Sequence, residues 1–282
     1  MAAIGAALPS AAGAGTINVH PGPSAIQKAI NKAHGGDTLR IHDGTYPETL
    51  DVGKRLTLKG VDGRPLINGR CDAQSTIDAD SNGVALKHLS VRGGDQYGAN
   101  YEFVDAGRVE NVVFRETCDG ALYGINVFQT GHMKLLDNDA KGFTDAGIYV
   151  GSLQDLGEKP YVIRGNSMHG NNIGILVEFG ADGLDVRVVN NRTSGNDLEG
   201  ESDRSGIMLR DNDDVLLSGN ITNNNGDYGI NLATFNGQSS DDNTLVDNSA
   251  DDNGLFDLFN EGSGNCGAGN AFGSVSGPLG PC

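Results

Sequence analysis

The sequence predicts an all-β fold, a right-handed parallel β-helix of about ten coils in one domain. A phrase of the form Gly-Ile-x-Val or Gly-Ile-x-Leu returns at intervals of 23 to 32 residues. A second phrase, a short apolar strand that ends in Asn, lies between successive copies of the first. The repeats contain no apolar pattern with the period of a helix. A unit of this kind cannot bury its apolar face alone, but coils stacked about 4.8 Å apart bury a continuous core.

The two phrases supply the strands of the predicted coils. The first phrase begins at Gly124, Gly147, Gly174, Gly206 and Gly229, with a degraded copy at Gly254. The second phrase ends at Asn138, Asn166, Asn191, Asn220 and Asn248. Stacking brings these Asn residues into one column, which predicts a ladder of side-chain amides bonded to the coils above and below.

The N-terminal segment divides into a leader and a cap. Residues 1–14 are rich in Ala and Gly and end in small residues, which indicates the remnant of a secretion signal or a disordered tail. The single β-helix domain is expected over residues 15–282. Within it, residues 24–34 have the spacing of an amphipathic helix, with Ser24 as the expected N-cap and Gly35 and Gly36 as the stop. This helix is expected to cover the open end of the stack, where strand edges would otherwise be unpaired.

Three segments interrupt the period and are expected to leave the stack as loops: Gly93 to Asn100, Gln154 to Lys159 and Asp197 to Arg204. Loops on one side of a solenoid commonly wall its binding face. Residues 262–282 form a Gly- and Pro-rich C-terminal tail, which a Cys266–Cys282 disulfide is expected to close. Cys71 and Cys118 pair if their coils are adjacent, but spacing alone does not fix the connectivity.

The composition limits the partners. A formal net charge of −17 argues against binding nucleic acid or an anionic membrane surface. No apolar stretch is long enough to span a membrane. The cysteines and the small-residue leader fit a secreted, extracellular protein. We expect it to be a monomer.

The opening coils resemble a known group. Gly36-Asp37-Thr38, Asp43-Gly44-Thr45-Tyr46 and Leu56-Thr57-Leu58-Lys59-Gly60 lie within a run, Ile17 to Gly60, that is similar to the start of pectin-lyase-like superfamily proteins. The NosD-like repeat proteins are the most similar subgroup, and the Cys266-to-Cys282 tail resembles the ends of secreted actinobacterial members. The resemblance implies the β-helix fold and a carbohydrate partner. Members include polysaccharide lyases, glycoside hydrolases, C5-epimerases and proteins without known chemistry.

The repeat also predicts which side chains face outward. With the Ile and the Val or Leu of each phrase facing inward, the residue between them and the residue after the phrase face outward. A third outward column lies two residues before each Gly. The side chains in these columns that can bind or react lie on neighbouring coils: Tyr149, Glu178, Arg204 and Arg210, beside Asp145 and Asn172. A plain surface salt bridge between Glu178 and Arg210 explains part of this pattern without any site.

A uronate polymer is the substrate that this groove would suit. Arg204 and Arg210 would hold carboxylates in forked contacts, with Asp145 and Asn172 as further substrate-binding residues. A lyase or epimerase removes the proton α to the carboxylate, so the developing enolate needs the positive charge of Arg210. Tyr149 is the expected base if the arginines lower its pKa, and Glu178 is the third catalytic candidate.

Calcium is the one cofactor that the sequence suggests. Related lyases bind Ca²⁺, and Asp211, Asp213 and Asp214 directly follow Arg210 with carboxylate oxygens of the kind that Ca²⁺ prefers. The same run is also typical of a corner between strands.

Two other functions stay open. A glycoside hydrolase would use a carboxylate pair about 5–10 Å apart, such as Glu178 with Asp145 or Asp211. A non-catalytic secreted repeat protein would bind glycans or a protein partner through its strand face. The sequence has no Trp, a common sugar-stacking residue, which favours the second of these.

Overall fold

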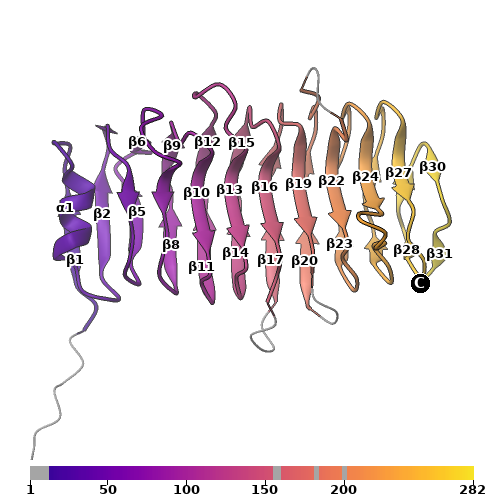
Figure 1. Cartoon of the computed structure of the whole chain (residues 1–282), viewed down its shortest axis with the longest axis horizontal. Coiled ribbons are helices and arrows are strands. Elements are labelled where there is room, and N and C mark those ends of the chain that lie inside the picture. Colours follow the sequence, from indigo (N-terminus) through magenta and orange to yellow (C-terminus); the bar gives the residue numbers. More distant parts are fainter. Residues whose placement is uncertain (1–12, 155–159, 181–183, 199–201) are drawn as a thin grey trace, which may run out of the picture.

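The computed structural model describes residues 13–154, 160–180, 184–198 and 202–282. The chain winds into one elongated stack of coils in sequence order, from the helix α1 (Ala25–Lys32) at one end to the C-terminus at the other (Figure 1). Each complete coil contributes strands to up to three sheets, and the named strands of the described residues pair in parallel. The predicted parallel β-helix is therefore confirmed.

The first sheet consists of β1 (Thr16–Val19), β2 (Thr38–His42), β5 (Thr57–Val61), β8 (Val84–Lys87), β11 (Ala106–Glu110), β14 (His132–Leu136), β17 (Tyr161–Arg164), β20 (Val186–Val189), β23 (Leu216–Ser218), β25 (Thr244–Val246), β28 (Cys266–Ala268) and β31 (Gly280–Pro281).

The second sheet consists of β3 (Thr45–Tyr46), β6 (Leu66–Asn68), β9 (Ser90–Arg92), β12 (Val113–Arg115), β15 (Asp139–Lys141), β18 (Ser167–Met168) and β21 (Arg192–Thr193), with the separate pair β26 (Ser249–Ala250) and β29 (Ala271–Phe272) nearer the C-terminus.

The third sheet consists of β4 (Leu50–Asp51), β7 (Ser75–Asp78), β10 (Tyr97–Glu102), β13 (Tyr123–Phe128), β16 (Ala146–Gly151), β19 (Ile173–Glu178), β22 (Ser205–Arg210), β24 (Tyr228–Ala233), β27 (Phe256–Asn260) and β30 (Val275–Ser276). The Gly-Ile-x-Val phrases form the central strands of this sheet.

The interior of the stack explains the residues of the phrase. Ile125 and Val127 of β13 are fully buried, and the Ile and Val of the following coils continue the same core. The phrase glycines leave no room for a side chain, because a Cβ at Gly206 would lie 2.7 Å from the carbonyl oxygen of Gly229 in the next coil. The repeated glycine is thus required by the spacing between coils.

The corner between the first and second sheets carries the predicted asparagine ladder. The side-chain amide of each member donates to the side-chain oxygen of the next at 2.9–3.0 Å. The members are Asn138, Asn166, Asn191, Asn220, Asn248 and Asn270. The residue before each of them has a positive φ, between 53° and 70°, and is Asp, Asn or Gly. These residue types adopt that conformation at little cost, which is why the corner reads Asp-Asn, Gly-Asn or Asn-Asn.

A second ladder was not predicted. Asn171, Asn196, Asn225 and Asn253 are bonded in the same way, at 2.9–3.1 Å, beyond the end of the second sheet.

The capping helix is confirmed, and Ser24 occupies the predicted N-cap position, but its side chain does not cap the helix. The helix spans Ala25–Lys32, and Ser24 has a left-handed backbone and makes no side-chain cap bond. The Glu48 carboxylate instead accepts bonds from the amides of Ile26 and Gln27 at 3.1 and 3.0 Å. At the other end the Lys54 ammonium donates to three carbonyls of the last turn and its flank. Residues in the irregular segments on either side of β4 therefore supply what local caps would have supplied.

The predictions for the cysteines, the C-terminal tail and the first loop have different outcomes. Cys266 is bonded to Cys282, as expected, and Cys71 is bonded to Cys118, a pairing that the sequence left open. The tail over 262–282 continues the stack through β28 to β31. The segment from 93 to 100 does not leave the stack entirely, because its last four residues open β10 and pair with β7 and β13.

Some predictions fall on residues that the structure does not describe. The predicted leader lies almost wholly outside the described residues, as do residues 155–159 and 199–201 of the two other predicted loops. In the described part of the chain, no helix has the length and apolar character needed to cross a membrane.

Candidate functional site

The outer face of the third sheet has the predicted columns. Asn126, Tyr149, Leu176, Met208 and Asn231 are register partners on successive strands. Phe128, Gly151, Glu178, Arg210 and Ala233 form the next column in the same way. The alternation of the strand therefore places Glu178 and Arg210 on adjacent coils, one column away from Tyr149.

The middle of this face is covered, although the sequence predicted an open groove. Tyr149, Leu176 and Met208 point away from the core of the stack and are nevertheless buried. They form a second apolar cluster with Ala146 and Ile173, against which Tyr123 and Phe128 pack. An outward-facing column is not the same as an exposed one, because irregular segments can lie over it.

Glu178 is the centre of a polar chain within this covered region. The Tyr149 hydroxyl donates to Glu178 Oε2 at 3.2 Å, and Arg210 Nη1 lies 3.4 Å from Glu178 Oε1. Tyr149 is 7 % exposed and Glu178 is 8 % exposed. The hydroxyl can reach Glu178 because Gly151 lies beneath it, and a side chain at Gly151 would collide with the Tyr149 hydroxyl. The structure thus brings the three predicted catalytic residues into contact.

The pKa of Tyr149 is shifted opposite to the prediction. Burial raises the pKa, and the neighbouring Glu178 carboxylate raises it further by charge and by accepting the hydroxyl's hydrogen bond. We expected the arginines to lower it, but the carboxylate lies between Tyr149 and Arg210. Tyr149 therefore keeps its proton at neutral pH, which suits a proton donor and not a base.

Arg210 has three partners. Nη2 lies 3.3 Å from Asp203 Oδ2, and the guanidinium carbon lies 5.2 Å from the centre of the Phe235 ring. Phe235 is held there by a tight hairpin in which Phe235 and Gln238 exchange backbone hydrogen bonds across Asn236 and Gly237. Both turn residues have positive φ, as an Asn-Gly hairpin requires. Asp203 and Phe235 were not predicted; the Asn-Gly pair is the only sequence signal that points to this hairpin.

Arg204 is not positioned as the predicted substrate clamp. Its guanidinium holds Asp227 in a forked contact, Nε to Oδ2 at 3.2 Å and Nη2 to Oδ1 at 2.9 Å, and also bonds Asp197. The Asp227 contact raises the pKa of Arg204. Asp227 already occupies the Nε–Nη2 edge of Arg204 that a substrate carboxylate would need for a forked contact.

The other two predicted binding residues are placed differently. Asp145 accepts a hydrogen bond from the Tyr123 hydroxyl at 2.6 Å. Tyr123 in turn stacks between Tyr97 and Tyr149, with ring centres 5.8 and 4.6 Å away. Asn172 is buried, and its side-chain oxygen has no hydrogen-bond partner among the residues that the structure describes. Asp145 thus supports an aromatic ladder along the third sheet that the sequence analysis did not identify.

The predicted calcium ligands lie in a corner. Asp211 has a positive φ, as do Phe103, Gln129, Ser152 and Phe179 at the same place after β10, β13, β16 and β19. Asp213 accepts a bond from the Asp241 amide at 2.7 Å, and Asp214 also has a positive φ. Among the residues described, no group of three His, Cys, Asp or Glu side chains could hold a metal ion. The three aspartates therefore do not fit a calcium site in this conformation.

A cavity of about 270 Å³ opens beside Arg210. Its walls include Asp203, Asn231, Tyr228, Phe259 and Glu261, and the Phe235 hairpin closes one side. Arg210 lines this cavity and also contacts Glu178, so it joins the cavity to the polar chain.

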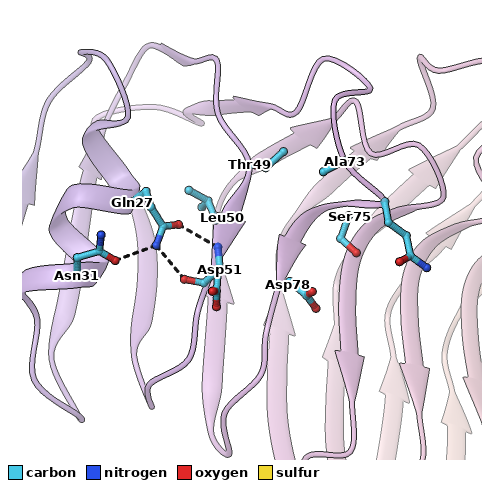
Figure 2. Close-up of a pocket in the computed structure, with 9 residues that line it drawn as sticks. Gln27, Asn31, Thr49, Leu50, Asp51, Ala73, Ser75 and Asp78 are labelled. Atoms are coloured by element: carbon cyan, nitrogen blue, oxygen red, sulfur yellow. Dashed lines mark hydrogen bonds between the residues drawn. The ribbon is translucent and has the colours of Figure 1, made fainter.

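A larger cavity, of about 590 Å³, lies near the capped end of the same sheet. Figure 2 shows Gln27 of α1 facing Asp51 of β4, with Asp78 of β7 on the next coil. The Gln27 side chain bonds the backbone of Asp51 in both directions, at 2.9 and 3.1 Å. Burial and nearby carboxylates raise the pKa of Asp78. This cavity is polar and acidic, and none of the residues predicted for chemistry lies in it.

Comparison with known proteins identifies the family. The family described as a right-handed beta helix region matches residues 123–275, more than half of the chain. The chain belongs to this right-handed β-helix family. The predicted hand of the coil is therefore confirmed.

Solved structures show the same fold. The pectate lyase Pel9A superposes with a TM-score of 0.66 over 95 % of this chain and 80 % of its own, at 12 % identity. An alginate lyase from Paenibacillus sp. strain FPU-7 gives a TM-score of 0.53 over 95 % and 97 %, at 13 % identity. Among curated proteins, no sequence matches this chain. The resemblance to the pectin-lyase-like superfamily is thus confirmed for the fold, and the NosD-like subgroup stays a prediction.

Proposed function

We propose that this protein is a polysaccharide lyase or C5-epimerase that acts on a uronate-containing polymer at the outer face of β16, β19 and β22. One observation carries the proposal: a single carboxylate, Glu178, lies between a protonated phenol and a guanidinium on three successive coils. The fold shared with a pectate lyase and an alginate lyase supports a polysaccharide partner.

The roles follow from the geometry and from the direction of the Tyr149 pKa shift. Arg210 pairs with the uronate carboxylate and stabilises the negative charge that develops when the α proton leaves. Glu178 accepts that proton. Tyr149, which burial keeps protonated, donates its proton to the departing glycosidic oxygen in elimination, or back to the sugar carbon in epimerisation. No step is assigned to Ca²⁺, because the predicted ligands do not converge.

The protein is further proposed to be secreted and to act as a monomer. Two disulfides suit an oxidising compartment, and one chain carries every residue of the proposed site.

A non-catalytic glycan-binding protein is the second candidate. It is favoured by the burial of Tyr149 and Glu178 and by the engagement of Arg204 with Asp227 and Asp197. A uronate must displace some of the covering side chains before it reaches Glu178, whereas a binding module needs only the exposed rim.

Turnover of defined uronate polymers tests the proposal. Polygalacturonate, alginate and glucuronate-containing polymers are incubated with the protein, with Ca²⁺ and with a chelator. Ultraviolet absorbance reports the unsaturated product, and proton NMR reports epimerised sugars. We expect one polymer to react, and Glu178→Gln, Tyr149→Phe and Arg210→Ala each to slow the reaction by about 100-fold or more.

Arg187→Ala is the matched control, because Arg187 pairs with Asp185 on the first sheet and lies outside the proposed site. Its rate should equal that of the wild type. Glycan binding without any reaction would support the second candidate, and a reaction that survives Arg210→Ala would contradict the assigned site.

A further inference from the structure

The cavity beside Arg210 contains a buried polar atom that none of the described residues satisfies. Asn231 is 2 % exposed and lines the cavity, and its side-chain oxygen has no hydrogen-bond partner. A buried acceptor left unpaired is costly, and such groups are usually paired with protein, water or ligand. The amide oxygen is therefore available to accept a bond from a hydroxyl group in the cavity.

An aromatic surface lies beside Asn231. Phe259 is the register partner of Asn231 on the next strand, and Tyr228 precedes Asn231 on β24. The rings of Tyr228 and Phe259 are 4.9 Å apart, and those of Phe256 and Phe259 are 6.1 Å apart. Tyr228 and Phe259 are only partly buried. Half-buried aromatic rings beside a polar acceptor offer a stacking surface for the apolar face of a sugar ring.

The charges of the side chains that line the cavity exclude an acidic sugar from it. Its walls carry one guanidinium, that of Arg210, and two carboxylates, those of Asp203 and Glu261. Arg210 is already 3.3 Å from Asp203 and 3.4 Å from Glu178. A second carboxylate beyond Arg210 would face Asp203 and Glu261, and the described part of the cavity wall holds no further cation.

We infer that this cavity is a subsite for one uncharged sugar unit, which Asn231 binds through a hydroxyl group and the Tyr228–Phe259 pair through stacking. The volume of about 270 Å³ is at the lower limit of ligand pockets, which suits one ring and not a chain. Together with the proposed function, on which this step rests, the subsite implies that the substrate is a mixed polymer. The reacting uronate lies at Arg210 and a neutral sugar lies next to it.

Binding of neutral oligosaccharides, measured apart from turnover, tests the subsite. Cello-, manno- and galacto-oligosaccharides and oligo-uronates of equal length are titrated into the wild-type protein and followed by calorimetry and NMR. We expect at least one neutral series to bind, and Asn231→Ala to weaken that binding about tenfold. Phe259→Leu is a second variant that removes the stacking surface and should weaken the same series.

Asn223→Ala is the matched control, because Asn223 accepts one hydrogen bond from the Asp251 amide and does not line the cavity. It should leave binding unchanged. The subsite is refuted if oligo-uronates bind and no neutral series does, or if folded Asn231→Ala and Phe259→Leu both bind as the wild type does. Neutral binding that depends on Asn231, without any uronate turnover, would instead refute the proposed function and leave the subsite standing.

Discussion

Tyr149 and Tyr123 illustrate how burial sets the chemistry of single residues on this face. Burial is the main cause that raises both pKa values, and the Asp145 and Glu178 carboxylates add to it. Tyr46 on the capped side of the stack has a pKa raised to about 12, again chiefly by burial. The folded chain therefore keeps phenolic protons that the unfolded chain would lose near pH 10.

This difference predicts how stability changes in alkali. The pKa of each of these tyrosines is higher in the folded state than the unfolded value of 10.0. At a pH between a tyrosine's unfolded and folded pKa, the folded state therefore binds more protons than the unfolded state. The free energy of unfolding therefore falls as the pH rises above about 10. In a spectrophotometric titration, most tyrosinate absorbance should appear together with loss of the far-ultraviolet circular dichroism signal. Ionisation of most tyrosines near pH 10 in a protein that stays folded would contradict the burial described here.

At the residue scale, the sequence predicts which way a side chain points but not which residues surround it. Strand alternation placed Glu178 and Arg210 on adjacent coils, and the structure has them 3.4 Å apart. It did not predict that Asp203 pairs with Arg210, or that Tyr149 is covered. Asp203 lies outside the repeated strands, and the packing of Tyr149 against Tyr123 and Glu178 depends on side-chain identities that the repeat does not set.

The asparagine ladder is the element whose removal should cost most per residue. The Asn191 side chain takes part in four hydrogen bonds: its oxygen accepts from the backbone and side chain of Asn166, and its amide donates to the Ile163 carbonyl and to Asn220. Asn191→Ala leaves these buried partners unpaired. We expect the free energy of unfolding to fall by about 3 kcal/mol in urea titrations.

Asn223→Ala is the comparison for this variant, because Asn223 makes one partly exposed bond. It should lower the free energy of unfolding by about 1 kcal/mol or less. Equal losses for the two variants would mean that the ladder adds no more stability than an ordinary corner bond.

At the element scale, the repeated strands were predictable because each phrase carries both its core residues and its corner. The capping helix was predictable from its apolar face, but its cap was not. Glu48 follows β3 and reaches the helix only after the chain has turned back. A contact between elements that are not neighbours in sequence leaves no local pattern.

Over the whole molecule, stacking converts residues about 25 positions apart into neighbours, and this is why one sequence period predicts the entire fold. The stacked chain is also strongly acidic, with a formal net charge of −17. Of the described residues that line the cavity beside it, Arg210 is the only Lys or Arg. A uronate polymer must therefore bind against a repulsive background, and its contact with Arg210 must offset that repulsion.

The position of a bound oligo-uronate tests the central claim most directly. A crystal structure of Glu178→Gln with an oligo-uronate should show the sugar chain across the outer face of β16, β19 and β22, with one carboxylate within hydrogen-bond distance of Arg210. An oligo-uronate bound to the first or second sheet, with no carboxylate at Arg210, would contradict the account.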